Sequence, residues 1–320
     1  MVSISANSPE HPQPMIRSGW RRFWDGSVGF LRGMVRYPLS LIGMLLVIGF
    51  VMLAFVGPMI SPYPYDQVLR GEDRRTLKEL PPSAAHWFGT DDKGRDVFSR
   101  VMTGARDTIG LPAVATLISV TLGTALGLAL GYFGGWFDEW GSRALDTLLA
   151  LPALVLALVM LTTIVPVLIE LDNPFIERVG ATNLSILLVI VVLYLPIVAR
   201  VIRSATLNVR DRGFVEAARL RGEKAPYILF REILPSVLPA LIVEASLRLS
   251  YAIFLVASLG FLGLGVQPPS PEWGRMVLDA RDKLVTSPWA LWFPAGAIVL
   301  FIISLNLMSD GLRRVLRYEG

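Results

Sequence analysis

The chain contains no cysteine and only two histidines. Without cysteine, neither disulfides nor thiolate metal sites can form. His11 and His86 lie far apart, in segments without other ligand-like residues, so we expect no metal site. The phosphate-binding pattern G-x-x-x-x-G-K-S/T is absent, and neither histidine lies near a candidate nucleophile. We therefore expect no catalytic residue and no cofactor.

Charged residues are also scarce, at 18% of the 320 residues, and they are clustered. By contrast, 53% of the residues are hydrophobic and the mean hydropathy is +0.55, which is an excess for a soluble core. The net charge is +4, but the arginines flank apolar stretches, which is typical of membrane topology rather than of nucleic-acid binding. The composition predicts a protein embedded in a lipid bilayer.

Six stretches are long and apolar enough to cross a bilayer, which needs about 20 helical residues. Several prolines lie inside or near them, and neighbouring helices can satisfy the carbonyls that a proline leaves free. The sequence therefore predicts an all-α polytopic membrane protein with six transmembrane helices. The stretches are residues 39–60, 109–133, 144–169, 184–202, 237–264 and 291–309.

The first stretch has two interpretations, a secretory signal or a retained anchor. It is too long for a signal, begins 38 residues into the chain and has no small-residue cleavage site after it, so we interpret it as an anchor. Residues 20–24, with two tryptophans and two arginines, predict a helix on the cytoplasmic membrane surface within segment 1–38.

Arginines and lysines give the expected orientation. They concentrate before the first stretch, between the fourth and fifth stretches and in the tail at 310–320, so both termini are expected in the cytoplasm. The 61–108 segment is assigned to the outside. It mixes basic and acidic residues, so its arginines and lysines are weaker evidence for orientation. The transmembrane domain would then be 39–309, with 203–235 as its cytoplasmic loop.

The most informative part of that loop is residues 211–235, DRGFVEAARLRGEKAPYILFREILP. A helical run begins near Glu216-Ala217-Ala218 and should stop near Gly222, because glycine adopts a positive φ without a Cβ clash. Pro226 fits the start of a second short helix. The sequence predicts two short helices joined at a glycine, with small residues on the first.

This spacing of Glu-Ala-Ala, Gly and Leu-Pro resembles the loop of binding-protein-dependent ABC importer permeases. The isoleucine of the generic loop is displaced by one residue, to Ile233, as in the peptide-type branch. In that family the loop is the coupling helix, which lies in a groove of the ATPase subunit. The resemblance assigns this role to Glu216, Ala217, Ala218, Gly222, Leu234 and Pro235.

Two further segments restrict the resemblance to one branch of this family. Residues 87–106, WFGTDDKGRDVFSRVMTGAR, and residues 260–273, GFLGLGVQPPSPEW, are similar to segments of the C-type subunit in peptide, opine and nickel permeases. The resemblance implies the ABC type I importer permease fold in a prokaryotic plasma (inner) membrane. It also implies a second related permease subunit, two ATPase subunits and an extracytoplasmic solute-binding protein as partners.

Residues 87–106 also have an interpretation independent of the family. Gly89 and Gly94 bracket Thr90-Asp91-Asp92, which is a turn and helix N-cap signal rather than a calcium loop. We expect Asp96 to form a local ion pair with Arg95 or Arg100.

A glycine repeat lies in the second stretch. Gly123, Gly127, Gly131 and Gly135 recur every four residues, which predicts one helix face for close packing.

Glu244 and Arg248 in the fifth stretch are four residues apart on one helical face. Charges in the hydrocarbon are costly and usually face a cavity or a partner. They line the translocation path or form a self-neutralised pair against other helices, and the sequence leaves both interpretations open. The family often has an acidic residue where this chain has Val256, so the substrate cannot be carried over from other members.

Three functions remain to be distinguished. The resemblance favours an ATP-driven importer of di- or oligopeptides, with opines, glutathione, nickel chelates or oligosaccharides as alternative cargo. A secondary transporter or channel would work without an ATPase subunit. A membrane scaffold would not transport.

Overall fold

The structure, a computed structural model, describes residues 37–171 and 173–318. The expected surface helix at residues 20–24 lies outside the described residues. The described part of the chain is all-α, as predicted, and its only β-pairing consists of isolated bridges such as Thr90 with Asp96. Its longer helices are α2 (Pro38–Ile60), α3 (Val97–Phe133), α4 (Gly135–Leu149), α5 (Ala153–Glu170), α7 (Ala181–Leu207), α10 (Leu234–Phe261) and α12 (Trp289–Tyr318).

Shorter elements connect these helices. They are α6 (Pro174–Val179), α8 (Gly213–Leu220), α9 (Ala225–Tyr227), a π-helical turn (Ile228–Ile233), α11 (Trp273–Ala280) and a 3₁₀ turn (Arg281–Lys283).

Within the described residues, six helices are long and apolar enough to span a membrane, in agreement with the predicted number. Their outward faces carry large exposed apolar side chains, among them Phe55, Leu117 and Val299. Such exposure would be unfavourable in water and is expected in lipid. The spans are Pro38–Ile60, Val97–Phe133, Ala153–Glu170, Ala181–Leu207, Ala225–Phe261 and Trp289–Val315.

The predicted third span, 144–169, was wrong at its start. The chain breaks after α4, and α5 begins at Ala153 behind Pro152, whose backbone is extended at φ −58° and ψ 123°. Proline has no N–H and disfavours a helical residue before it, so helix α4 cannot run on into α5. Residues 144–149 belong to α4, which carries polar side chains along one side.

The second span begins earlier than predicted, at Val97 rather than at residue 109. Asp96 caps α3, because its carboxylate accepts a hydrogen bond from the Ser99 N–H at 2.8 Å. The first turns are polar yet buried, including Ser99 and Arg100. They pack against protein rather than lipid, so hydropathy does not detect them.

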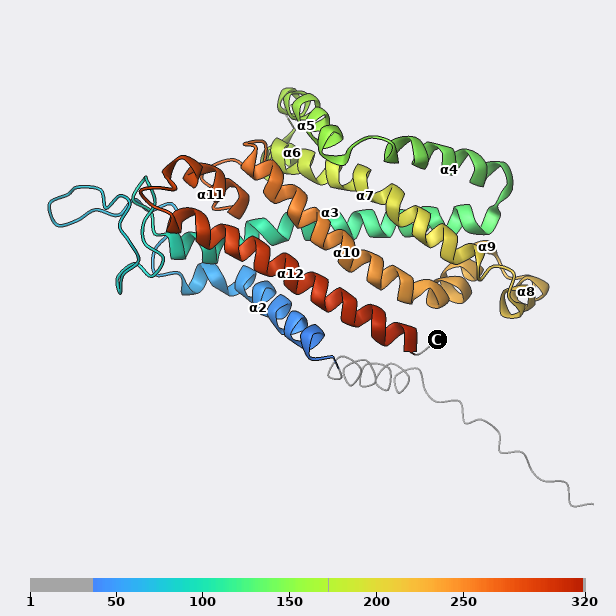
Figure 1. The fold of residues 1–320 in the computed structure, drawn as a ribbon. Helices are drawn as coiled ribbons and strands as arrows, with labels where there is room; N and C mark the ends of the chain where they lie inside the picture. The colour runs from blue at the N-terminus through green and yellow to red at the C-terminus, as the bar shows by residue number, and fades with distance from the viewer. Residues whose placement is uncertain (1–36, 172, 319–320) are drawn as a thin grey trace, which may run out of the picture.

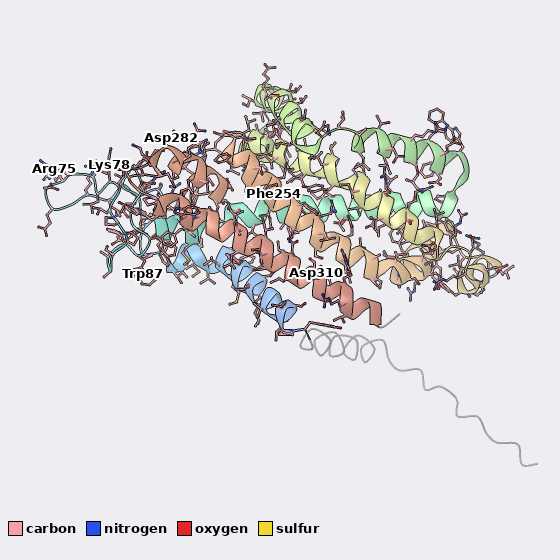
Figure 2. All side chains as sticks on the ribbon, viewed as in Figure 1. Arg75, Lys78, Trp87, Phe254, Asp282 and Asp310 are labelled. Carbon is pink, nitrogen blue, oxygen red and sulfur yellow. The ribbon has the colours of Figure 1, made fainter. Side chains whose placement is uncertain are left out.

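The long helices run side by side and place connecting segments at two opposite ends (Figure 1). One end, the α11 end, carries α11 and residues 61–96. The other, the α8 end, carries α8 and α9, and α12 runs toward it. Arg75, Lys78 and Asp282 lie at the α11 end, and Phe254 lies on the half of α10 nearer that end (Figure 2).

The glycine stripe of α3 packs against α7. A Cβ on Gly123 would lie 2.9 Å from the Leu195 carbonyl oxygen, and one on Gly131 would lie 2.7 Å from the Thr206 Cβ. Close packing is thus confirmed for Gly123, Gly127 and Gly131. Gly135 differs, because it begins α4 and an added Cβ there would meet nothing within 4 Å.

We predict that Gly127→Ala destabilises the protein by about 1–3 kcal/mol, the usual range for overpacking. The new Cβ would lie 2.5 Å from the carbonyl oxygen of Ala199, a backbone atom that cannot rotate away. Thermal unfolding in detergent measures the effect. Gly110→Ala is the matched control on the same helix, since its Cβ meets nothing within 4 Å. Equal melting temperatures for the two variants would contradict this account of the α3–α7 contact.

Candidate functional site

The loop at the α8 end turns between two helices at Gly222, as predicted, but the second helix is not a separate short one, because it continues from Ala225 into α10. Helix α8 ends at Leu220, and Gly222 has a φ of +79°. The Glu223 N–H donates to the Ala218 carbonyl at 3.2 Å, and the Gly222 N–H donates to the Arg219 carbonyl at 2.9 Å. These two bonds form a Schellman motif, which satisfies carbonyls at the helix end and requires the left-handed residue. Gly222 therefore sets the angle between α8 and α9.

The two faces of α8 differ in burial. Val215 and Ala218 are buried and pack with Ile202 of α7 and Ile228 of the π-helical turn. Glu216 and Ala217 are exposed on the opposite face. Of the six residues assigned to coupling, Glu216, Ala217, Gly222 and Pro235 are exposed, Leu234 is half-buried and Ala218 is fully buried.

Ala218 therefore contributes to the packing beneath α8. It lies in the apolar cluster under α8 and has no exposed surface with which to contact another chain. Its small size lets α8 lie close to the ends of α7 and α10. The resemblance assigned Ala218 to the same contact as Glu216, and the structure places these two side chains on different faces.

An exposed apolar group was missed by sequence reasoning. The Leu220 side chain is 84% exposed, and Phe214 and Phe230 are exposed nearby in the loop. Arg219 and Arg221 flank Leu220. Isolated apolar residues in a charged loop carry no periodic signal, so the sequence did not single them out. We call Phe214, Glu216, Ala217, Leu220 and Phe230 the loop surface.

The loop is fastened to the end of α3. The Arg210 guanidinium donates to the Gly131 carbonyl at 3.2 Å. The Arg219 guanidinium lies over the Tyr132 ring, 5.0 Å from its centroid, in a cation–π contact. Both partners belong to the last turn of α3, so the loop and α3 are held together.

Helix α4 is fastened to α7 by charge. Arg203 forms a bidentate ion pair with Asp138, and its Nη2 lies 2.6 Å from Oδ2. This hydrogen bond from Arg203 lowers the pKa of the Asp138 carboxyl below its ordinary value. Arg200 makes a second ion pair with Asp146.

The link from the loop into α10 is continuous. Helix α9, the π-helical turn and α10 form one helical run, Ala225–Phe261. Ile228 and Ile233 of this run are buried beneath α8. A displacement of α8 would therefore act directly on the start of a membrane-spanning helix.

Glu244 and Arg248 lie in that helix and contact each other. Arg248 Nε is 2.8 Å from Glu244 Oε1, but the N–H is not directed at the oxygen, so the contact is an ion pair without a good hydrogen bond. Their side chains are 10% and 12% exposed, respectively. The Arg248 guanidinium also lies 5.6 Å from the Tyr194 ring of α7 and 4.9 Å from the Tyr251 ring.

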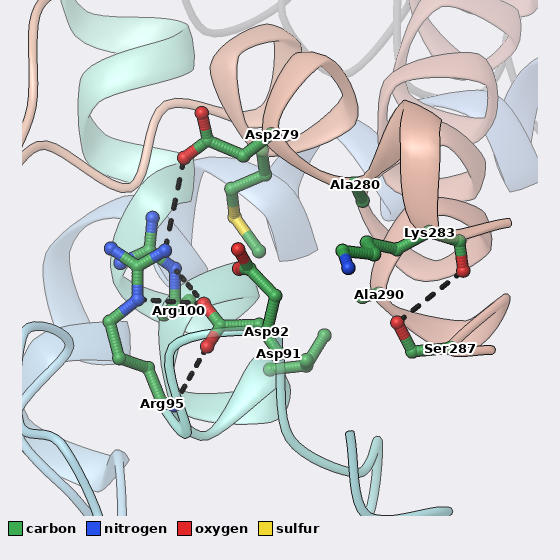
Figure 3. Close-up of a pocket in the computed structure, with 11 residues that line it drawn as sticks. Asp91, Asp92, Arg95, Arg100, Asp279, Ala280, Lys283, Ser287 and Ala290 are labelled. Atoms are coloured by element: carbon green, nitrogen blue, oxygen red, sulfur yellow. Dashed lines mark hydrogen bonds and ion pairs between the residues drawn. The ribbon is translucent and has the colours of Figure 1, made fainter. Parts of the chain in front are cut away.

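The α11 end contains a buried ion network that joins segments distant in sequence (Figure 3). Arg95 Nε lies 2.7 Å from Asp91 Oδ2, and Arg95 Nη2 lies 3.8 Å from Asp279 Oδ2 on α11. Arg100 Nε lies 4.0 Å from the same Asp91 oxygen. Because each charge has an opposite neighbour, the network can be buried without leaving a charge unpaired.

The expected ion pair of Asp96 was wrong. Asp91, not Asp96, pairs with Arg95 and Arg100. Asp96 instead caps α3 and lies 3.1 Å from Nδ1 of His86. The Gly94 turn directs these neighbouring acids to different partners, and Asp279, remote in sequence, could not have been assigned from spacing alone.

Glu272 is a second buried acid at this end. Its carboxylate caps α11 by accepting hydrogen bonds from the N–H groups of Gly274 at 2.7 Å and Arg275 at 2.8 Å. Burial nevertheless raises the pKa of Glu272 to about 7, and the Asp107 charge also favours the protonated form. The carboxyl group joins α10 to α11, because a Cβ on Gly260 would lie 2.4 Å from its Oε2.

We predict that stability decreases as the pH rises from about 4.5 to about 7, the unfolded and folded pKa values of Glu272. The folded state binds more protons than the unfolded state in this window, so its advantage is complete below the unfolded pKa and lost above the folded one. Glu272→Gln should flatten this part of the melting-temperature profile, measured in detergent. An unchanged slope in the variant would show that other groups cause it.

These features define a polytopic membrane protein with an amphipathic two-helix loop at one end. A family profile described as "Binding-protein-dependent transport system inner membrane component" matches residues 123–318. A second, "N-terminal TM domain of oligopeptide transport permease C", matches residues 27–82. The chain belongs to this family and is an ABC importer permease of the dipeptide/oligopeptide branch.

Individual relatives agree with this assignment. A dipeptide transport system permease protein, DppC, of Alkalihalophilus pseudofirmus is 36% identical over 317 residues, which cover 99% of this chain and 95% of the relative. A glutathione transport system permease protein, GsiD, of Escherichia coli O1:K1 is 34% identical over 307 residues, covering 94% and 91%. Both relatives are transport system permease proteins.

A solved structure supports the fold. A chain of the MetNI methionine ABC transporter, in an inward-facing conformation, matches with a TM-score of 0.51 and 18% identity. The match covers 69% of this chain and 96% of that one. This similarity extends to the arrangement of helices and identifies no substrate.

Proposed function

We propose that this chain forms half of the translocation path of an ATP-driven peptide importer and couples it to ATPase subunits through residues 211–235. The loop surface is the observation that carries this proposal. It exposes Leu220 and Glu216 on α8, and the other side of this helix is packed into the bundle. Leu220 is an exposed apolar side chain flanked by charged residues, and its helix is packed against the bundle. Such a side chain can insert into a groove on another protein.

The proposed topology places the α8 end in the cytoplasm. Helix α12 runs toward the α8 end, which supports a cytoplasmic C-terminus (Figure 1). The basic residues of the loop, such as Arg212 and Arg221, favour the same side. ATP would then bind and be hydrolysed in two separate ATPase subunits, one of which would contact the loop surface, with no catalytic residue in this chain.

The remaining partners follow from the family. A second, related permease subunit would supply the other half of the path. An extracytoplasmic solute-binding protein would deliver cargo at the α11 end. Closure of the ATPase pair would move the loops, and the path would alternate between outward and inward opening.

We predict that Leu220→Asp lowers the amount of ATPase that copurifies with this chain by about tenfold or more, as expected for a central apolar contact. Leu220 is 84% exposed, so the substitution should leave the fold intact. ATP-dependent uptake by the reconstituted complex should fall in parallel. Copurification from the same membranes is the direct measurement.

Val285→Asp is the matched control, because Val285 is 96% exposed at the α11 end. Glu216→Lys tests the charged part of the loop surface and should also weaken the contact. ATP-dependent uptake that survives both Leu220→Asp and Glu216→Lys would exclude this coupling role. A purified active complex without any ATPase would favour a secondary transporter or channel.

We further propose that Glu244 and Arg248 act as one neutral unit beside the translocation path. Their mutual contact and low exposure support this arrangement. The aromatic rings of Tyr194 and Tyr251 complete the surroundings of the guanidinium. Tyr251 is 52% exposed and is the member of the group that would face the path.

We predict that Glu244→Gln or Arg248→Gln alone destabilises the protein by about 3–5 kcal/mol, because each leaves a buried charge unpaired. The double variant should recover most of this stability and retain uptake. Melting temperature and peptide uptake of the three variants are the measurements. A stable double variant that no longer transports would instead assign the two charges to direct contact with the substrate.

Peptides are the proposed cargo, supported by the names of the dipeptide and glutathione permease relatives. Opines, nickel chelates and oligosaccharides are the alternatives within the branch. Binding measurements on the cognate solute-binding protein would decide among them, because that protein selects the cargo. A substrate-stimulated ATPase signal from the reconstituted complex would exclude a scaffold without transport.

A further inference from the structure

A cavity of about 640 Å³ opens where α2 and α3 meet at the α11 end. The end of α2, the segment that follows it, the third turn of α3 and the loop before α11 all contribute to its lining. This volume lies within the usual range of small-molecule sites, about 300–1,000 Å³. The cavity is separate from the ion network of Figure 3 and from the loop surface.

Two opposite charges line this cavity without pairing to each other. Arg106 is exposed and has no carboxylate within ion-pair distance in the described part of the chain. Asp107 is half-buried and accepts a hydrogen bond from the Ser270 hydroxyl, a neutral donor. Neighbouring residues on a helix do not face one another, so α3 holds the two charges apart.

The arrangement differs from the rest of the α11 end. There Arg95 pairs with both Asp91 and Asp279. Arg106 and Asp107 are adjacent in sequence, and the described residues provide neither with an opposite charge. A ligand that carries both a positive and a negative charge would give each of these two residues an oppositely charged partner.

The walls of the cavity are fixed in place. Arg100 donates to the Tyr65 carbonyl at 3.1 Å, and the Tyr63 N–H donates to the Ser99 hydroxyl at 3.3 Å. The Tyr63 ring lies 5.5 Å from the His86 ring. Tyrosine rings give apolar contact, and their hydroxyls can donate to an oxyanion.

The proposed topology places the cavity at the level of lipid head groups, because it opens where a membrane span ends. It begins at Pro58 and Ser61, at the end of the span Pro38–Ile60. Tyrosine is enriched at this depth, because the ring contacts lipid tails while the hydroxyl remains hydrated.

We propose that this cavity binds a zwitterion, with an oxyanion at Arg106 and an ammonium group at Asp107. Two sources carry this chemistry. One is the phosphoethanolamine head group of a membrane lipid, and the other is a free peptide with charged termini. The inference concerns this chain's own residues and does not depend on coupling to an ATPase.

The test uses the purified full-length transporter complex and two matched pairs of probes. Dihexanoyl phosphatidylethanolamine is compared with dihexanoyl phosphatidylglycerol, which lacks the ammonium group. Dialanine is compared with N-acetyl-dialanine, which also lacks the ammonium group. Saturable binding of each probe is measured for the wild type, Arg106→Gln and Asp107→Asn.

In at least one pair, the zwitterion should bind at least about tenfold more tightly than the probe without the ammonium group. Each of the two substitutions should remove most of that preference. The lipid pair or the peptide pair that shows this pattern identifies the source. Arg106→Lys should retain part of the binding, which separates loss of charge from loss of fold. Arg178→Gln, an exposed arginine on α6, is the control and should change nothing.

Two results would overturn the proposal. One is the absence of a saturable preference for a zwitterion in both pairs. The other is a preference that persists unchanged in Arg106→Gln and Asp107→Asn, which would place the binding elsewhere in the complex.

Discussion

The close contact between α3 and α7 is the constraint on which the rest of the structure depends. Three glycines let the backbones approach until an added Cβ would meet a neighbour at 2.9 Å or less. Helices in lipid gain little from hydrophobic association, so van der Waals contact at such small residues contributes much of the packing energy. With α3 and α7 fixed, the ion pair of Arg203 with Asp138 fastens α4, and Arg210 fastens the loop to the end of α3.

The sequence predicted those features that depend on solvent and on local backbone chemistry. Six spans could be found because a bilayer requires long apolar helices. The turn at Gly222 was predictable because its positive φ excludes most other residues. Both are local demands, and a single sequence records them directly.

Other features were predicted wrongly or not predicted at all. The third span begins at Ala153 rather than at residue 144, because Pro152 interrupts the helix although the apolar stretch continues across it. The start of α3 was missed because Ser99 and Arg100 are buried by protein rather than lipid. The pairing of Arg95 with Asp279, the burial of Ala218 and the cavity beside Arg106 all depend on segments distant in sequence, and spacing carries no information about such contacts.

A continuous structural connection joins the two ends of the molecule. The helical run Ala225–Phe261 begins beneath α8 and ends where Gly260 lies against Glu272. From there Trp273 donates through its indole N–H to the Val101 carbonyl of α3 at 2.9 Å. Each contact is a backbone approach or a buried hydrogen bond, so none can lengthen without losing packing or leaving a polar group unsatisfied. A displacement of the loop surface must therefore move α10 as a unit or break one of these contacts. In the proposed importer, either response would change the shape of the translocation path.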